Sequence, residues 1–596
     1  MTDMNDNPFL NRPVQRPESN TAGSASPPPP VPLTPTPPSP TEPAPHPRVM
    51  SAGARSVRDT LQTVLFALLL AFSFRTFCVE AFVIPTGSMA PTLNGAHFRV
   101  ICPQCGYRFN ADANVEVQYV NGRLVQVGNA QLENTNAIPS PTYLVCPNCH
   151  ALIPATSLPD KPVIARRFVN SSGSASRTIY FPHASNGDRI LILKFLYWFH
   201  PPKRWDVVVF REPRFGKQNF IKRLVGLPGD TVRIISGDVY INGKIAHKPP
   251  AVQRAMLQLV YDNDYYPTDA GKPRIDGRTW TTPWISHVDE TTDGKWFTAG
   301  PVVRFESGNP AARGRITFQD RGRYLYNDSS YNNRRITKRG HHLVGNLYLH
   351  TLWTPHTASA GISLSLGKPD ARFKTTLDSA GSIVLWQWNN NQHRYRVVPK
   401  KQWDFHHRVG VLLANHSYRI AMADCQHQVR FWINGRLVMQ YTPTWTVAMA
   451  LAQYAKEAGG HRMKPRISVH VMGACTLRHL ILMRDIYYTQ MRRQLPSTNP
   501  YDPLGSVPGT GTMNNPITLK AGQYFVLGDN SNDSDDSRAW GHIEPILRAE
   551  GIPYGVVPAR YMMGQAFMVY WPAGFRPLQS INIPIIPNVG RMRLIR

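Results

Sequence analysis

Two short stretches of this sequence carry residue types that could perform acyl transfer. Ser88 stands in "PTGSMAPTL" and Lys222 stands in "FIKRLVGLPGD". A serine hydroxyl is a weak nucleophile until a base removes its proton, and a lysine is such a base only when desolvation or a nearby positive charge keeps it neutral. The apolar neighbours of Lys222 favour that state. Each stretch also has an ordinary interpretation, a turn in the first case and a surface lysine on an amphipathic strand in the second.

The turn around Ser88 also offers donors for the negative oxygen that develops on an attacked carbonyl group. Gly87 allows close approach of a substrate backbone, Ser88 has its own N–H, and Thr86 adds a hydroxyl. We therefore expect an oxyanion site formed by Thr86 and Ser88.

A third stretch, "YFVLGDNSNDSDDSRAWGHI" at residues 524–543, is an apolar strand followed by a loop of small polar residues. Such a loop can orient other groups through short hydrogen bonds. The alternatives are a simple acidic turn or a calcium loop, for which the EF-hand spacing and its closing glutamate are missing. The carboxylates that suggest calcium are Asp529, Asp533, Asp535 and Asp536.

An uncharged apolar run at residues 60–74, "TLQTVLFALLLAFSF", must position this chemistry. Extension to Val79 reaches the roughly 20 residues that a bilayer requires if Arg75 snorkels to the interface. We expect an uncleaved transmembrane anchor at residues 57–79, with a buried soluble helix and a cleaved signal peptide as alternatives.

Residues 1–56 are rich in proline and predict a disordered tail. Arg48, Arg55 and Arg58 precede the apolar run, so the positive-inside rule places this tail in the cytoplasm and the rest of the chain outside the inner membrane.

The totals predict several domains and an anionic partner. The chain has 596 residues, 42% of them hydrophobic, and a formal charge of +28. Anionic lipid, a cell-wall polymer or nucleic acid would each satisfy this charge. Nucleic acid is not expected, because the basic residues are dispersed and no recognition helix or RNP-like aromatic motif is present.

Five stretches closely resemble the conserved sequence boxes of type I signal peptidases, the bacterial leader peptidase family with a Ser/Lys dyad, and occur in the same order. They are the apolar anchor, "PTGSMAPTL", "KRWDVVVF", "FIKRLVGLPGD" and "GDNSNDSDDSR". The resemblance covers about residues 57–101, 187–247 and 517–572. It implies a mainly β catalytic domain on one membrane anchor. It also implies cleavage of signal peptides after small residues, as in Ala-x-Ala sites.

The resemblance implies that Ser88 is the nucleophile, Lys222 the general base and Thr86 an oxyanion donor. Met89 and Pro91 also match the first box.

In the last box, Ser534 matches the serine that orients the lysine, while Asp536 and Arg538 match a structural ion pair. One departure is Ser531, which stands where many members have arginine. Arg223 also follows the lysine as in the family.

Two C-x2-C pairs separated by 40 residues, in an insertion at residues 102–179, resemble a zinc ribbon. Four thiolates leave no open coordination position, so we expect a structural zinc and no catalytic cofactor. Disulfides are the alternative, because an oxidising compartment is expected. Cys425 and Cys475 could pair or remain free. The four candidate ligands are Cys102, Cys105, Cys146 and Cys149.

Residues 251–490 predict a second insertion, made of short alternating strands with a hairpin turn at Asn434-Gly435. It looks like a laminin-G or concanavalin-like jelly roll, a β-sandwich. Such folds often bind carbohydrate, although tryptophans are more often core residues. The tryptophans that would suit a glycan are Trp386, Trp388 and Trp432.

These expectations assign residues 80–101, 180–250 and 510–596 to a discontinuous catalytic domain, and residues 491–509 to a linker. The expected function is a membrane-bound serine endopeptidase acting on signal peptides of preproteins. The alternative is an inactive surface-binding protein that displays a glycan- or protein-binding β-sandwich. A zinc hydrolase ranks third, because no open ligand set such as H-E-x-x-H is present.

Overall fold

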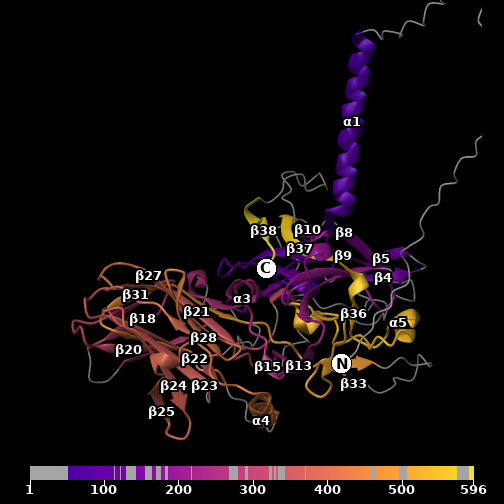
Figure 1. Ribbon diagram of the computed structural model, residues 1–596. Coiled ribbons are helices and arrows are strands. Elements are labelled where there is room, and N and C mark those ends of the chain that lie inside the picture. Colours follow the sequence, from indigo (N-terminus) through magenta and orange to yellow (C-terminus); the bar gives the residue numbers. More distant parts are fainter. Residues whose placement is uncertain are drawn as a thin grey trace, which may run out of the picture. The chain divides into compact units, whose positions relative to one another are not determined.

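The structure is a computed structural model, shown in Figure 1. The expected disordered tail lies almost wholly outside the described residues. The structure describes residues 52–596 with gaps at residues 113–114, 121–122, 129–142, 155–163, 170–175, 182–184, 217, 268–278, 289–292, 321–324, 328–329, 333–341, 369–370, 459–463, 495–505 and 573–588.

The N-terminal apolar run forms the long helix α1 (Ala52–Phe77) (Figure 1). Alanine and leucine favour a helix, and the run contains no proline to interrupt it. Its segment Ser56–Phe77 is 22 residues long with a mean hydropathy of 1.5, which is long and apolar enough to cross a bilayer.

An eight-stranded antiparallel sheet carries the candidate active site. Its strands have the order β1-β10-β37-β11-β12-β35-β36, with β38 paired to β37. Three distant parts of the chain contribute to this sheet, so it is assembled only by tertiary folding. The strands are β1 (Val79–Val83), β10 (Arg189–Leu193), β11 (Val207–Arg211), β12 (Asn219–Gly226), β35 (Gln523–Leu527), β36 (Val557–Pro558), β37 (Met562–Trp571) and β38 (Arg593–Leu594).

A four-stranded sheet of order β15-β14-β13-β34 follows β12. Its apolar side chains Val232 and Ile234 share one buried cluster with Val225 of β12 and Phe525 of β35. The two sheets therefore share a core. The strands are β13 (Thr231–Ile235), β14 (Asp238–Ile241), β15 (Lys244–Ile245) and β34 (Ile517–Thr518).

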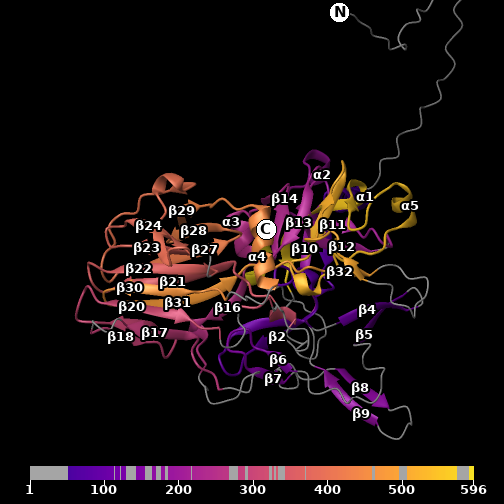
Figure 2. The same ribbon diagram turned by 90° about the horizontal axis from the view of Figure 1, so that it is seen from below.

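Two larger sheets, of nine and seven strands, form the inserted β-sandwich (Figure 2). The first has the order β18-β19-β31-β21-β27-β28-β29-β26, with β16 paired to β31. Its strands are β16 (Gln258–Asp262), β18 (Lys295–Phe297), β19 (Val303–Glu306), β21 (Leu347–Pro355), β26 (Phe405–His406), β27 (Tyr418–Cys425), β28 (Gln428–Ile433), β29 (Arg436–Tyr441) and β31 (Cys475–Arg484).

The second sheet has the order β17-β20-β30-β22-β23-β24-β25. Buried residues such as Phe305 and Trp353 of the first sheet and Phe373 of the second belong to one core. Its strands are β17 (Trp284–Val288), β20 (Arg313–Phe318), β22 (Gly361–Lys368), β23 (Ala371–Leu377), β24 (Ile383–Asn389), β25 (Arg394–Val397) and β30 (Ser468–Met472).

The hairpin predicted at Asn434-Gly435 is confirmed. β28 pairs with β29, and both turn residues have positive φ, 50° at Asn434 and 80° at Gly435, as a two-residue hairpin of this kind requires.

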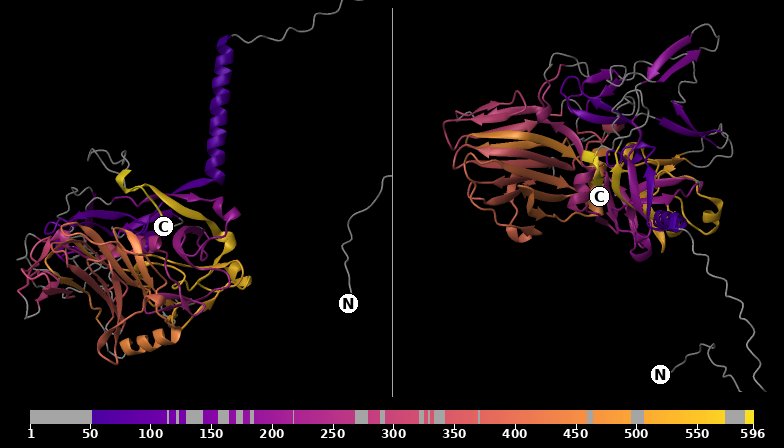
Figure 3. Two further views of the ribbon diagram at one scale, coloured as in Figure 1. Left: turned by 60° about the vertical axis from the view of Figure 1, so that its left-hand side comes forward. Right: turned by 90° about the horizontal axis from the view of Figure 1, so that it is seen from above.

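The remaining elements are short, and α4, with 12 residues, contains the most residues among them; it is the orange helix in the left view of Figure 3. Two hairpins carry the four cysteines of the two C-x2-C motifs. They consist of β2 (His97–Ile101) with β3 (Arg108–Asp112), and β6 (Tyr143–Val145) with β7 (Leu152–Pro154). The other elements are α2 (Leu196–Phe199), α3 (Pro250–Met256), α4 (Val447–Ala458), α5 (Pro545–Ala549) and the paired strands β4 (Val115–Val120), β5 (Arg123–Gly128), β8 (Ile164–Val169), β9 (Ser176–Phe181), β32 (Arg492–Gln494) and β33 (Ser506–Pro508).

The expected fold class is confirmed: the chain is mainly β, with an apolar N-terminal helix, a four-cysteine cluster and a β-sandwich.

Candidate active site

Ser88 and Lys222, which lie 134 residues apart in the chain, form a hydrogen bond. Ser88 lies in a 3-10 turn at Gly87–Met89, and Lys222 lies on β12, which is held on both sides by β11 and β35. The Lys222 Nζ donates to the Ser88 Oγ at 2.6 Å. Lys222 is 3% exposed and Ser88 is 9% exposed. This contact would let a neutral lysine receive the serine proton without rearrangement.

Burial lowers the pKa of Lys222 to about 8. The charges of Asp536 and Asp535 oppose this shift, while those of Arg214 and Arg538 add to it. Because burial disfavours the charged ammonium, about half of the lysine is neutral at pH 8. The lysine is therefore a usable base near neutral pH.

Arg223, the next residue on β12, forms a fully buried ion pair with Asp529. Successive side chains on a strand point to opposite faces, so Arg223 projects away from Lys222. Its guanidinium donates to both carboxylate oxygens of Asp529 at 2.8 and 2.6 Å, and both side chains are completely buried. The sequence alone did not pair Arg223 with Asp529, although the opposite charges of these two residues, one in each of two matched boxes, could have suggested it.

Asn530 holds the backbone of the turn that presents Ser88. Its N–H donates to the Ser88 carbonyl oxygen at 3.0 Å, and its side-chain Nδ2 donates to the Gly87 carbonyl oxygen at 3.0 Å. Asn530 is itself only 1% exposed. The polar loop therefore fixes the position of Ser88 through these two hydrogen bonds.

Thr86 immediately precedes this turn in extended conformation, with φ −115° and ψ 159°. Its side chain is exposed and makes no capping hydrogen bond. This position leaves the hydroxyl available to a bound molecule. The oxyanion role stays a prediction.

Asp536 and Arg538 form a second buried ion pair in the polar loop. The guanidinium donates to Asp536 at 2.9 and 2.7 Å, and the second of these carboxylate oxygens also accepts from the Gly528 N–H at 3.0 Å. Arg538 also donates to the Ser531 hydroxyl at 2.9 Å. Ser531, the departure from the family pattern, is thus held inside the loop by Arg538.

The hydroxyl of Ser534 is buried beside the Ser88 turn. The side chain is 3% exposed, and its Oγ has no hydrogen-bond partner in the described part of the chain. A Cβ on Gly528 would lie 2.0 Å from this Oγ and 2.6 Å from the Ser88 carbonyl oxygen, so only glycine fits at residue 528. The expected role of Ser534 in orienting Lys222 stays a prediction.

Residues 325–327 and 330–332 of the inserted sandwich lie against the same turn and the polar loop. Tyr331 is 1% exposed and donates from its hydroxyl to the Ala96 carbonyl oxygen at 3.0 Å. A Cβ on Gly87 would lie 2.3 Å from the Tyr331 ring carbon Cε1. The ring therefore packs directly on the glycine that precedes Ser88.

Two asparagines of this segment bind the polar loop. Asn332 and Asn530 exchange hydrogen bonds at 2.7 and 2.8 Å. Asn327 Nδ2 donates to Asn532 Oδ1 at 3.0 Å, and Asn532 Nδ2 donates to the Asn327 carbonyl oxygen at 2.5 Å. Asn327, Tyr331 and Asn332 could not be predicted from the sequence, because no local pattern marks them.

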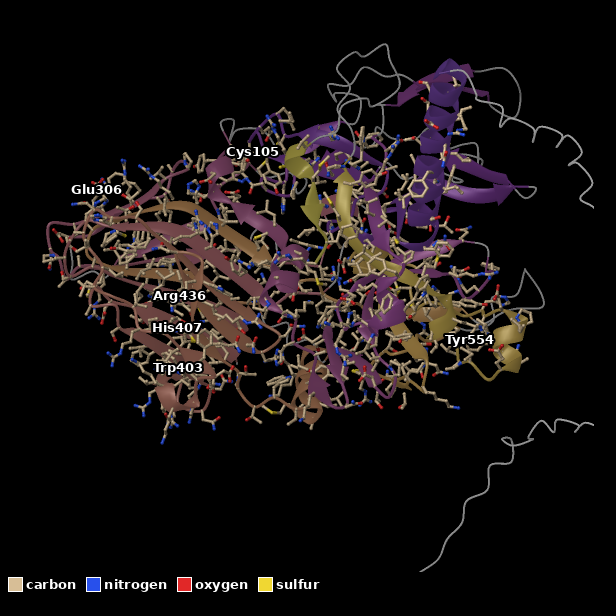
Figure 4. All side chains as sticks on the ribbon, turned by 45° about the horizontal axis from the view of Figure 1, so that its top comes forward. Cys105, Glu306, Trp403, His407, Arg436 and Tyr554 are labelled. Carbon is tan, nitrogen blue, oxygen red and sulfur yellow. The ribbon has the colours of Figure 1, made fainter. Side chains whose placement is uncertain are left out.

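The four cysteines of the paired hairpins converge on one point, and their Sγ atoms all lie within 4.8 Å of one another. The Cys102–Cys149 and Cys105–Cys146 Sγ distances are both 3.6 Å, and all seven cysteines of the chain are free. Figure 4 labels Cys105 in this cluster. Four sulfurs on a tetrahedral zinc would lie about 3.8 Å apart, so the donor set fits that ion.

The cysteine cluster is joined to the sandwich through Asn148, which is completely buried. Its Oδ1 accepts from the Asp262 N–H at 2.7 Å, and its Nδ2 donates to the Tyr265 carbonyl oxygen at 2.9 Å. The cluster is thus part of the support between the hairpins and the sandwich, with no contact to the Ser88–Lys222 pair among its described hydrogen bonds.

The chain is similar to the signal peptidase family, peptidase S26, in two segments that lie on either side of an insertion. The family's sequence pattern matches residues 158–300 and 483–571. These ranges include Lys222 and the polar loop, whereas Ser88 lies before them and is joined to the domain by the geometry above.

Curated relatives are signal peptidases I. A probable signal peptidase I-1 from Synechocystis sp. is 34% identical over 114 residues, which are 18% of this chain and 57% of that protein. The signal peptidase I from Leptolyngbya laminosa is 37% identical over 86 residues, which are 13% of this chain and 42% of that protein. The chain spans about half the length of these relatives.

Solved structures similar to part of this chain include a carbohydrate-binding module, CBM66 from Bacillus subtilis. It is 11% identical with a TM-score of 0.20, and the match covers 34% of this chain and 95% of that one. The Caenorhabditis elegans galectin LEC-6 is 10% identical with a TM-score of 0.16, and the match covers 24% of this chain and 82% of that one.

Proposed function

We propose that this protein is a membrane-bound serine endopeptidase that removes N-terminal signal peptides from exported preproteins. The observation that carries the proposal is the buried Lys222–Ser88 hydrogen bond of 2.6 Å, in a chain with a signal peptidase S26 domain. Ser88 is the nucleophile and Lys222 the general base. Specificity for small residues before the cleaved bond, as in Ala-x-Ala sites, follows from the family resemblance.

In the acylation step, neutral Lys222 accepts the Ser88 proton while the Ser88 Oγ forms a bond to the scissile carbonyl carbon. The oxygen becomes negative and is stabilised by the Ser88 N–H and the Thr86 hydroxyl. Collapse breaks the C–N bond, and the Lys222 ammonium returns the proton to the leaving amine. The products are an acyl-enzyme and the mature protein with a free N-terminus.

In the deacylation step, Lys222 is neutral again and removes a proton from a water molecule that attacks the ester. Breakdown of that intermediate returns the proton to Ser88 and releases the signal peptide with a new carboxylate. The free Ser534 hydroxyl, buried beside the Ser88 turn, is the group proposed to orient the lysine during both steps.

The substrate is proposed to bind as an added β-strand along β1. In the described part of the chain, β1 is the terminal strand of its sheet and pairs only with β10. An unpaired strand edge can accept an extended peptide through main-chain hydrogen bonds. Because β1 ends at Val83 and Ser88 follows five residues later, a peptide on this edge would reach the nucleophile.

The location that suits this function is the outer face of a cell membrane. Helix α1 is apolar enough to act as a single anchor, and Arg58 lies before its apolar centre. The tail before the helix would then be cytoplasmic, and the catalytic domain extracytoplasmic.

The cysteine cluster is proposed to hold one structural zinc ion. Its four sulfurs form a closed ligand set, so the ion would stabilise the paired hairpins and supply no catalytic chemistry. The catalytic steps above use no metal or cofactor.

The test is cleavage of a purified preprotein with an Ala-x-Ala site by the full chain in detergent. The wild type should release the signal peptide, whereas Ser88→Ala and Lys222→Ala should each reduce the rate by at least about 10⁴-fold. Lys295→Ala, which changes an exposed lysine of the sandwich, is the matched control and should cleave normally. Retained cleavage by either dyad variant would disprove the assignment.

A further inference from the structure

The seven-stranded sheet of the sandwich has one apolar and one polar face. Alternation along each strand sends Phe373 and Leu385 into the core, where both are buried. The neighbours Lys374 and Trp386 therefore lie on the opposite face, directly paired across β23 and β24. This second face is called the outer face below.

Aromatic rings and cations are stacked on one half of the outer face. The Lys374 Nζ lies 5.2 Å from the Trp386 ring centre and 5.0 Å from the Tyr395 ring centre. The Arg372 guanidinium lies 4.0 Å over Trp388, which meets Tyr395 edge to face at 5.2 Å. These contacts hold large side chains in fixed positions, as a preformed binding surface requires.

The other half of the outer face adds two exposed arginines on β20, Arg313 and Arg315. They form no ion pair within the described residues, and the same holds for Lys374. The outward positions of β17, β20, β30, β22, β23, β24 and β25 contain no aspartate or glutamate. These positions are Ile285, His287, Arg313, Arg315, Thr317, Ser468, His470, Met472, Gly361, Ser363, Ser365, Gly367, Arg372, Lys374, Thr376, Val384, Trp386, Trp388, Tyr395 and Val397.

The electrostatic environment agrees with this composition. Burial lowers the pKa of Lys374, and the charge of Arg313 lowers it further. Burial also lowers the pKa of His470 to about 4, with additional contributions from Lys374 and Arg315. The charged groups that affect these two side chains are thus all cations.

A row of hydroxyl groups lies between the two basic halves. Ser363 bonds Thr376 at 2.9 Å, and the buried Ser365 bonds the Tyr395 hydroxyl at 3.1 Å and so fixes that ring on the face, leaving Ser363, Thr376 and Tyr395 to meet a ligand. Hydroxyl groups both donate and accept, and so match the hydroxyls of a sugar chain.

We propose that the outer face of the seven-stranded sheet binds an acidic polysaccharide, with Arg313, Arg315 and Lys374 contacting its carboxylates or phosphates. Tyr395 and the two tryptophans then contact the sugar rings. A polysaccharide is favoured over nucleic acid because of the hydroxyl row and the extracytoplasmic location, and only this last point rests on the proposed function. Trp432 takes no part, since it is 7% exposed on the other sheet and packs against Tyr348.

The test measures binding of the full chain in detergent to polygalacturonate, to neutral dextran and to a single-stranded oligonucleotide, each at low and high salt. We expect binding to polygalacturonate that weakens with salt, little binding to dextran and weaker binding to the oligonucleotide. Lys374→Gln and the double change Arg313→Gln/Arg315→Gln should each weaken polygalacturonate binding about tenfold.

Arg436→Gln is the matched control, because Arg436 is an exposed arginine on the nine-stranded sheet (Figure 4). It should bind as the wild type does. An equal loss in this control, equal binding of dextran, or tighter binding of the oligonucleotide would each overturn the inference. Signal peptide cleavage is measured on the same samples, so a failure of polysaccharide binding is distinguished from a failure of the peptidase assignment.

Discussion

Asn332 of the inserted sandwich and Asn530 of the polar loop form a reciprocal amide pair beside the Ser88 turn. Asn332 Nδ2 donates to Asn530 Oδ1 at 2.7 Å, and Asn530 Nδ2 donates back at 2.8 Å. The same Nδ2 of Asn530 donates to the Gly87 carbonyl oxygen. The insertion therefore acts on the nucleophile through one intermediate residue, which makes Asn332 a positioning residue in the proposed mechanism.

Replacing Asn332 with alanine should lower kcat about tenfold with little change in KM, because the Ser88 turn loses support while the β1 edge is unaffected. Asn332→Asp keeps the acceptor for Asn530 and should retain an intermediate kcat. Steady-state cleavage of a preprotein measures both. Asn391→Ala, at an exposed turn of the sandwich, is the control, and an equal loss there would contradict a positioning role.

Gly87 and Tyr331 should behave as a coupled pair. Gly87→Ala puts a Cβ 2.3 Å from the Tyr331 ring, so it should displace the Ser88 turn and remove most activity. Tyr331→Ala clears that space, and the double variant should recover part of the lost kcat. The cleavage rates of the wild type, the two single variants and the double variant form a double-mutant cycle.

If the double variant is no more active than Gly87→Ala, the Tyr331 contact is not what excludes a side chain at residue 87. Tyr331→Phe serves as the control for fold. It keeps the ring and loses only the bond to Ala96, which should cost about 1 kcal/mol of stability in a thermal unfolding measurement.

Cleavage should depend on pH through Lys222. In the proposed mechanism the neutral lysine is the base, so kcat/KM should rise with pH below about 8 and level off above it. The charge of Asp535 raises the pKa of Lys222, so Asp535→Asn should move the midpoint of this rise to lower pH. A pH profile of kcat/KM for both proteins measures the shift.

Glu306→Gln is the control for that profile, because Glu306 is an exposed carboxylate of the sandwich (Figure 4). Its midpoint should equal that of the wild type. A midpoint near 10 in the wild type, or a shift to higher pH in Asp535→Asn, would contradict the assigned base.

Purified protein should contain about one zinc ion per chain, bound by the four clustered cysteines. Cys146→Ser should lose the metal and lower the thermal unfolding midpoint, because the paired hairpins lose their common ligand. Elemental analysis and thermal unfolding measure the two effects. Cys425→Ala, away from the cluster, should keep the metal, and a metal-free wild type with oxidised cysteines would favour the disulfide alternative.

The sequence pointed to Ser88, Lys222 and the apolar helix, because each lies in a short pattern that is recognisable without tertiary context. "PTGSM" and "FIKRL" named Ser88 and Lys222, and the apolar run named α1. The hairpin at Asn434-Gly435 was also readable, since its turn needs residues that accept positive φ. These features are local, because the backbone preferences of neighbouring residues are enough to specify the helix and the turn.

Tertiary structure alone decided which part of the inserted sandwich meets the site and which charged residues pair beneath it. Asn332 and Asn530 are 198 residues apart, and Arg223 and Asp529 are 306 apart, distances over which no periodic pattern carries information. Their pairing follows from how the buried faces of separate sheets pack, and that packing brings Tyr331 onto Gly87. The sequence thus marked Ser88, Lys222 and the apolar helix, whereas packing between distant segments decided what surrounds Ser88.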